Sequence, residues 1–344
     1  MYPTPPGPEG LSSSGADDLP PYHVPPPLPS TPPRRDRVWL HYLLFILTLV
    51  STTLTGADNY AVFSLDFNQL NRLLALPDAE RQAWATALAS TPSYYLNGLW
   101  YSLTVLAILG CHEMGHYYAS LRYGVDVTRP FFIPAPTFTL AGTLGAFIRI
   151  RSRIPTKVAL FDIGIAGPIA GFLVAVPALF IGLSMSRLER LPDDPSNLWE
   201  LGEPLLFQFA AWLMLGPPPE GYTISMHPMA FAAWFGLLAT ALNLFPISQL
   251  DGGHICYAVL GRRSTWVTYL MIAIAIGLTF VSLSWVAWAV LLVIMIGVLG
   301  PHHPPTFDEH DPIGIPRLIL AGFALVMLIV CFTPAPIGPF VGVR

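Results

Sequence analysis

Long apolar stretches, separated by short polar or proline-rich segments, dominate the chain from Trp39 onward. A helix that crosses a bilayer needs about 20 mostly apolar residues. Seven stretches come close to this length or exceed it: roughly 39–55, 95–121, 158–185, 230–250, 266–283, 285–299 and 316–332. The fifth and sixth are joined only around Ser284, so they form either a tight hairpin or one broken element. The pattern predicts an all-α polytopic membrane protein with about six to seven transmembrane helices.

Two apolar segments do not fit this pattern. Residues 130–150 are interrupted by proline, contain several glycines and are rich in Thr, Phe and Ile, which indicates a small β or re-entrant element. Such backbone is tolerated at membrane depth only where it is buried in protein or lines a water-filled cavity. The stretch 204–216, which precedes three prolines, is expected to form an interfacial helix on the outer side.

Composition supports a chain whose main solvent is lipid. Hydrophobic residues make up 53% of the 344 residues and charged residues 11%, with a mean hydropathy of +0.55, whereas a soluble domain carries about 25% charged residues. We therefore expect a lipid bilayer as a partner. The net charge of -4 predicts no nucleic-acid partner. Three scattered cysteines match neither a disulfide framework nor a zinc ribbon.

The organisation along the chain follows from these stretches. Residues 1–33 are rich in Pro, Ser and Gly, and we expect a disordered cytosolic tail rather than a secretory signal peptide. Residues 34–94 should hold the first transmembrane helix and an external loop, 95–261 the membrane core with the motifs below, and 262–344 the C-terminal transmembrane helices. Basic residues near helix ends place the N-terminus in the cytosol. They are Arg34, Arg35, Arg37, Arg149, Arg151, Arg153, Lys157, Arg262, Arg263 and Arg317, opposed by Arg187 and Arg190.

The second stretch contains the sequence His112-Glu113-Met114-Gly115-His116, an H-E-x-x-H motif. On a helix, residues i and i+4 share a face, so both imidazoles can approach one zinc ion. Glu113 is turned about 100° around the axis and can act as general base toward a water at the metal. Ionisable side chains within an apolar span are costly, by roughly 2.5–3.5 kcal/mol for a central Asp, which favours a functional role.

A catalytic zinc site has three protein ligands and one open position. The candidate for the third ligand is Asp251, in the segment Asn243-Leu244-Phe245-Pro246-Ile247-Ser248-Gln249-Leu250-Asp251-Gly252 at the end of the fourth stretch. If the spans alternate, the second and fourth run in the same direction. Asp251 and His116 are then expected near the same, cytosolic, leaflet.

H-E-x-x-H in one span and N-x-x-P-x-x-x-x-D-G in a later one together resemble the site-2 protease family of intramembrane zinc metalloproteases. The resemblance covers about residues 95–254. It implies that His112, His116 and Asp251 bind Zn²⁺ and that Glu113 activates water. It also implies a membrane-tethered substrate whose transmembrane segment is cut, in regulated intramembrane proteolysis. Many family members carry PDZ or CBS modules, but the roughly 40 residues between Met185 and Pro228 are too few for a PDZ domain and the stretch after Phe332 is too short for CBS, so we expect a resemblance to the minimal branch.

Two further features have alternative interpretations. The resemblance implies that Asn243 helps to hold substrate or its oxyanion, but a buried amide can equally form an interhelical hydrogen bond. Residues 141–147 are similar to the family's docking strand, whose edge could pair with an unwound substrate; a packed hairpin without substrate contact is the alternative. The glycines Gly167 and Gly171 predict close helix packing, and we expect this third stretch to lie between the two ligand-bearing ones as a scaffold.

Other polar residues are assigned no metal. We expect His254 to be an outer or interfacial residue, and His302, His303 and His310 to lie in a solvated loop. One alternative is a zinc protease with a glutamate as third ligand, but Glu189, Glu200, Glu203, Glu220 and Glu309 all fall in predicted loops. Another is a non-proteolytic membrane protein, a transporter or an inactive scaffold. The sequence favours a zinc metalloendopeptidase and leaves its oligomeric state open.

Overall fold

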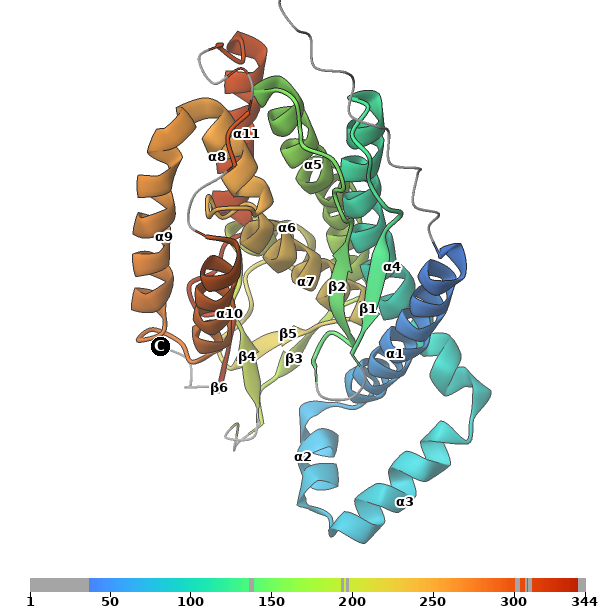
Figure 1. Cartoon of the computed structure of the whole chain (residues 1–344). Helices are drawn as coiled ribbons and strands as arrows, with labels where there is room; N and C mark the ends of the chain where they lie inside the picture. Colours follow the sequence, from blue (N-terminus) through green and yellow to red (C-terminus); the bar gives the residue numbers. More distant parts are fainter. Residues whose placement is uncertain are drawn as a thin grey trace, which may run out of the picture. The chain divides into compact units, whose positions relative to one another are not determined.

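The computed structural model describes residues 37–135, 139–192, 195, 198–300, 304–306, 308 and 311–339 (Figure 1). The tail predicted over residues 1–33 lies outside the described residues, as do His302, His303, Glu309 and His310. The described helices are α1 (Val38–Ser64), α2 (Phe67–Ala75), α3 (Asp78–Ala89), α4 (Pro92–Arg122), α5 (Lys157–Ser184), α6 (Leu205–Leu215), α7 (Pro228–Asn243), α8 (Asp251–Leu260), α9 (Ser264–Leu278), α10 (Ser284–Leu299) and α11 (Ile315–Cys331).

Each of the seven predicted apolar stretches forms a helix. They correspond to α1, α4, α5, α7, α9, α10 and α11, and the predicted outer segment forms α6. Within the described residues, α1 and α5 are long and apolar enough to cross a membrane, whereas α6, α7, α10 and α11 are shorter apolar helices. α9 and α10 have 15 and 16 residues, about 23–24 Å of rise against a hydrocarbon core of about 30 Å. The number of membrane crossings therefore stays a prediction.

The fourth stretch departs from its predicted boundary. α7 ends at Asn243, and the chain then forms a loop of residues 244–250 before α8 begins at Asp251. Pro246 has no N–H to donate and disfavours helical backbone at Phe245, so the helix cannot continue through this segment. Asp251 is thus the first residue of a new helix and not the last residue of the fourth span.

The described strands form three two-stranded antiparallel sheets. β1 (Phe131–Pro134) pairs with β2 (Thr143–Phe147), which confirms the β element predicted over residues 130–150. β3 (Arg187–Arg190) pairs with β5 (Tyr222–Ser225), and β4 (Trp199–Leu201) pairs with β6 (Ile337–Pro339). The expectation of one β element was therefore incomplete. The two additional sheets lie together at the end of the molecule opposite the start of α5 and α11 (Figure 1).

α5 packs against α4, α7 and α8, as the close packing expected of the third stretch requires, but it does not separate the ligand-bearing helices, because α4 and α7 also contact each other. Small residues let these helices approach closely. A Cβ built at Gly182 would overlap the backbone of Ala230 in α7, and one at Gly236 would lie 2.8 Å from the Ile108 side chain of α4. Trp234, 1% exposed, fills the core beside them. The helices that bear the motifs are thereby packed against one scaffold helix.

Three hydrogen bonds hold the β1–β2 hairpin against α1 and α4. The His41 ring nitrogen Nδ1 of α1 lies 3.1 Å from the Pro130 carbonyl oxygen, next to the start of β1. At the other end of the hairpin, Ser51 donates to the Gly142 carbonyl at 2.8 Å, and Tyr101 of α4 donates to the Ala141 carbonyl at 2.9 Å. The hairpin is therefore fixed at both ends beside the helix that carries H-E-x-x-H.

α11 is attached to the scaffold by an ion pair. The Arg317 guanidinium donates to both carboxylate oxygens of Asp162 in α5, at 2.8 Å each, and the Tyr123 hydroxyl donates to the same carboxylate. Burial and this bond raise the pKa of Tyr123, so the phenol remains a neutral donor. The start of α11, the start of α5 and the end of α4 are thus joined at one end of the molecule.

Candidate metal centre

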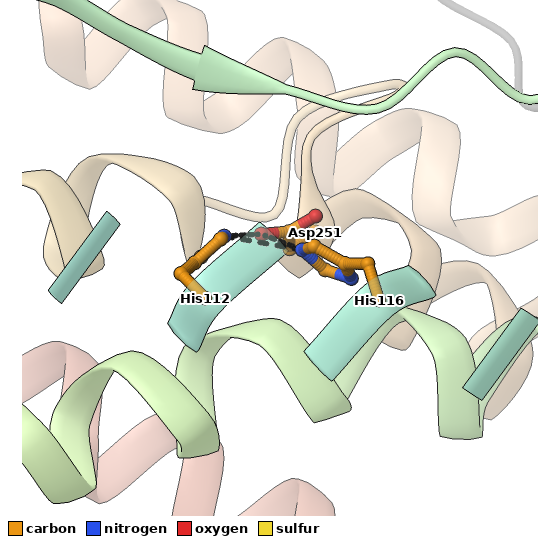
Figure 2. A group of neighbouring side chains, drawn as sticks. All are labelled: His112, His116 and Asp251. Atoms are coloured by element: carbon orange, nitrogen blue, oxygen red, sulfur yellow. Dashed lines mark hydrogen bonds and ion pairs between the residues drawn. The ribbon is translucent and has the colours of Figure 1, made fainter. Parts of the chain in front are cut away.

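The H-E-x-x-H residues lie on the inward face of α4. His112, Glu113 and His116 are 5%, 7% and 7% exposed. One helical turn separates the two histidines, so their rings project to the same side, and Figure 2 shows both rings directed toward Asp251. Burial of three ionisable side chains on one helix requires partners, and the rest of the site supplies them.

Three donor atoms converge to form the centre. His112 Nε2 and His116 Nε2 are 3.1 Å apart, and Asp251 Oδ2 lies 3.2 Å from each of them. Tetrahedral ligands at about 2.0–2.1 Å from a zinc ion are about 3.3 Å apart. The triangle of donor atoms therefore has the size that three ligands of one zinc ion require. Among the described residues, these three side chains form the one group of His, Cys, Asp and Glu ligands that could hold a metal ion.

The orientation of His116 is set from α5. Its Nδ1 lies 2.7 Å from the Ile163 carbonyl oxygen, so Nδ1 carries the proton and Nε2 presents its lone pair to the centre. A Cβ built at Gly167 would overlap the His116 ring at Nε2, and one at Gly171 would lie 3.2 Å from the Cβ of His112. The two glycines of the third stretch therefore make room for the two imidazoles.

Asp251 reaches the centre because α8 packs directly on the loop before it. A Cβ at Gly252 would overlap the Leu244 carbonyl, and one at Gly253 would overlap the Ser248 carbonyl. Only glycine permits the first turn of α8 to approach the loop backbone this closely. In the sequence Asp-Gly-Gly, the aspartate thus supplies the carboxylate and the two glycines permit the close packing of α8 on the loop.

Glu113 lies beside the metal ligands without joining them. Its carboxyl group accepts a hydrogen bond from the backbone amide of Ile148, just beyond β2, and His112, His116 and Asp251 all lie within electrostatic range. The interaction with Ile148 directs the side chain toward the hairpin side of the centre. Glu113 does not belong to the group of donor atoms that could hold the metal among the described residues, which leaves it available as a general base.

Asn243 also borders the centre. Its side-chain Nδ2 lies 3.4 Å from His112 Nε2, at the last turn of α7. The amide thus contacts one of the three atoms of the donor triangle and joins α7 to α4. Both the substrate-holding and the interhelical interpretation remain compatible with this position.

The residues that the sequence left out of the centre lie elsewhere. His254 is in α8, and a Cβ at Gly164 would lie 2.9 Å from its Cβ. Glu189 accepts a hydrogen bond from the Phe67 amide at 2.7 Å, and no glutamate belongs to the donor group of the described residues. Asp308, in the loop that was assigned no metal, accepts from the Lys157 amide at 2.8 Å at the start of α5. The three cysteines are free.

Sequence reasoning missed three participants. The Ile163 carbonyl and the Ile148 amide are backbone groups, and no residue type signals them. The glycine pattern predicts a scaffold role for Gly167, but the group that requires the space at this position is the His116 imidazole and not another helix backbone.

Two histidines, one aspartate and an adjacent glutamate, buried among packed helices, define a zinc-metalloprotease type of centre. A family model described as peptidase family M50 matches residues 100–284, which include all four of these residues. The chain belongs to peptidase family M50.

Curated relatives agree with this assignment. The chain is 31% identical over 241 residues to a probable chloroplastic zinc metalloprotease, EGY1, of Arabidopsis thaliana, covering 67% of this chain and 42% of the relative. It is 33% identical over 242 residues to EGY1 of Oryza sativa subsp. japonica, covering 66% and 39%. It is 31% identical over 251 residues to EGY2 of Oryza sativa subsp. indica, covering 71% and 44%. The chain thus spans about two fifths of the length of these relatives. No solved structure gives a significant match.

Proposed function

We propose that this protein is an intramembrane zinc metalloendopeptidase that hydrolyses a peptide bond within, or at the edge of, the transmembrane segment of a membrane-tethered substrate. The observation that carries the proposal is the triangle of His112, His116 and Asp251 donor atoms, 3.1–3.2 Å apart, with Glu113 beside it. The family and the names of the relatives support the zinc and protease parts of the proposal.

Each residue of the centre has a distinct role in the proposed reaction. His112, His116 and Asp251 would hold Zn²⁺, which, when bound, acts as a Lewis acid that polarises the scissile carbonyl and activates water. Glu113 accepts the proton of the attacking water and can pass it to the leaving amine. The Ile148 amide orients the Glu113 carboxyl group for this transfer.

We assign Asn243 to the developing negative charge. Its Nδ2 lies beside His112 Nε2, so its N–H can donate to the oxygen of a tetrahedral intermediate at the centre. The Asn243 amide is attached to the last turn of α7, and its position is therefore fixed before substrate arrives. A fixed donor needs no reorganisation during the reaction, which is the source of its catalytic effect.

The β1–β2 hairpin is the proposed substrate dock. β2 pairs with β1 on one edge, and among the described strands it has no partner on the other. Just beyond β2, the Ile148 amide points to Glu113, so the second edge leads directly to the centre. A helical substrate must be unwound before its amide can be attacked, and the β2 edge offers hydrogen-bonding groups for the unwound chain.

The membrane setting completes the proposal. The long apolar helices α1 and α5, together with the shorter ones, support a multi-pass protein. The end of α4 and the start of α5 are joined to α11 through Asp162, at the same end of the molecule where basic residues predict the cytosol. We propose that the N-terminus and the active-site side of the protein face the cytosol.

The test is cleavage of a single-span substrate in liposomes by the purified protein. Glu113→Gln keeps the length and hydrogen-bonding ability of the side chain but cannot accept the proton. It should retain zinc and lose cleavage by a factor of at least about 10². Cleavage by the Glu113→Gln variant at the rate of the unmodified protein would remove Glu113 from the mechanism. An unmodified protein that binds zinc but cuts none of a panel of single-span substrates would favour an inactive scaffold.

A further inference from the structure

The loop that delivers Asp251 has a strained backbone. Ser248 has a φ of +42°, and it is the only non-glycine residue with a positive φ among the described residues. L-residues avoid this region because the side chain crowds the backbone, so such a conformation persists only where neighbouring groups hold it. Ser248 lies three residues before Asp251 and is 3% exposed. The groups that hold Ser248 are therefore of interest for the metal centre.

Two helices outside the central scaffold supply these groups. The Ser248 amide donates to Thr268 Oγ1 in α9 at 3.1 Å, and the Ser248 hydroxyl donates to the Gly300 carbonyl, directly after α10, at 2.8 Å. Thr268 is 3% exposed, and its hydroxyl in turn contacts the Pro246 carbonyl at 3.5 Å. The α9–α10 hairpin thus holds the loop at two backbone positions.

The position of Ser248 determines that of Asp251 because the loop and the first turn of α8 are packed without free space between them. The first turn of α8 lies so close to the loop that a Cβ at Gly253 would overlap the Ser248 carbonyl. Displacement of Ser248 must therefore move the start of α8 and with it the Asp251 carboxylate. Interfaces without free volume transmit such shifts.

Much of the surface of the α9–α10 hairpin is exposed, and a few buried residues attach it to the rest of the protein. The buried residues of α9 are Ser264, Thr268 and Ala275, while Trp266, Phe280 and Leu283 are 77%, 89% and 83% exposed. In α10, Trp285 stacks on Phe245 of the same loop at 5.9 Å, and its Nε1 donates to the Pro334 carbonyl at 2.8 Å. Both helices of the hairpin thus contact the loop of residues 244–250, and the hairpin also contacts the segment after α11.

We propose that Thr268, with Ser248, is a positioning residue for the third metal ligand, and that the α9–α10 hairpin sets the place of the Asp251 carboxylate at the centre. The proposal rests on the proposed zinc site. The hydroxyl of Thr268 bonds to the loop backbone at Ser248 and Pro246, so Thr268 acts on the metal ligand through the loop. The hairpin is therefore part of the metal centre's support, although it contributes no ligand.

The test compares Thr268→Val, which has the same shape without the hydroxyl, with Thr268→Ser, which restores it. Zinc affinity is measured by chelator competition in lipid nanodiscs, and the absorption spectrum of the Co²⁺-loaded protein reports the ligand geometry. Loss of an outer hydrogen bond at a metal site typically weakens binding by 10–100-fold. We expect about tenfold weaker zinc binding and an altered cobalt spectrum for Thr268→Val, and nearly unmodified values for Thr268→Ser.

A matched control is Thr279→Val just after α9, where the hydroxyl donates only to the Ile276 carbonyl. Ser248→Ala, which removes only the bond to Gly300, gives a second arm with an expected loss smaller than that of Thr268→Val. Parent-like zinc affinity and cobalt spectrum in both Thr268→Val and Ser248→Ala would overturn the positioning role. Failure of the unmodified protein to bind zinc would instead overturn the proposed function itself.

Discussion

The metal-facing nitrogen of His116 lies against the backbone of Gly167, so closely that the position has no room for a Cβ. This contact joins the H-E-x-x-H helix to α5, a helix that contributes none of the three ligands. The Ile163 carbonyl, one turn earlier on α5, accepts the proton of the same ring. One helix therefore both orients the imidazole and limits its position.

Gly167→Ala should therefore displace the His116 ring and weaken zinc binding by at least tenfold, while the helices remain folded. Alanine favours helix over glycine by up to about 1 kcal/mol, so backbone propensity does not predict the loss. Gly322→Ala in α11, where an added Cβ meets nothing within 4 Å, is the matched control. Equal zinc affinity in the two variants would show that the contact has no effect on the ligand.

Asn243→Ala should lower kcat by about 10²–10³, the usual effect of removing one oxyanion donor. Zinc content should be unchanged because Asn243 is not among the ligands. Steady-state cleavage of a single-span substrate together with metal analysis checks both parts. A parent-like kcat would favour the alternative, in which the amide only joins neighbouring helices.

Tyr101→Phe should impair substrate use without affecting the metal. The fully buried hydroxyl donates to the Ala141 carbonyl at the end of the β1–β2 hairpin, and its loss leaves that carbonyl unpaired, at a cost of about 1–3 kcal/mol. We expect kcat/KM to fall about tenfold with zinc affinity unchanged. Tyr118→Phe, on the exposed face of the same helix, is the control. If both variants cut equally well, the hairpin's position does not limit substrate binding.

Acid should destabilise the N-terminal end of α7 through His227. This residue caps α7 by accepting the Met229 amide, and rings of Tyr60, Phe63 and Trp100 surround it. The neighbouring charge is Arg187, over the Phe63 ring. Burial lowers the pKa of His227 below its usual 6.5.

Because the folded pKa of His227 lies below the unfolded value, the unfolded state binds the proton more readily. The stabilisation is fully present above about pH 6.5 and is lost as pH falls through the lowered folded value. Thermal unfolding between pH 7.5 and 5 should show this decline. His227→Asn, which retains a capping side chain, should show a smaller decline. Identical pH profiles for the two proteins would exclude His227 as the cause.

The sequence predicted the elements whose signals are local. Seven apolar runs predicted seven helices, and the spacing of His112 and His116 predicted two ligands on one face. α2 was missed, although Asp66 and Gln69 form a capping box that marks its start. The β3–β5 and β4–β6 pairs were missed because their strands are separated by long stretches of chain, and short strands carry little periodic signal.

The boundary of α7 shows a different limit. Apolar content extends through Leu250, but Pro246 and the close packing of Gly252 and Gly253 end the helix at Asn243 and start a new one at Asp251. Hydropathy indicates burial and not helix continuity. The approach of Asp251 to the two histidines depends on tertiary packing. In the sequence, only the pairing of the two motifs indicated it.

The most direct test of the metal centre is the zinc content of the purified protein and of its Asp251→Ala variant, measured by elemental analysis against protein concentration. The account predicts one zinc per chain in the unmodified protein and its loss when the carboxylate is removed, because two neutral imidazoles alone bind zinc weakly. Stoichiometric zinc retained by the Asp251→Ala variant would contradict it, since the third ligand would then have to come from another residue.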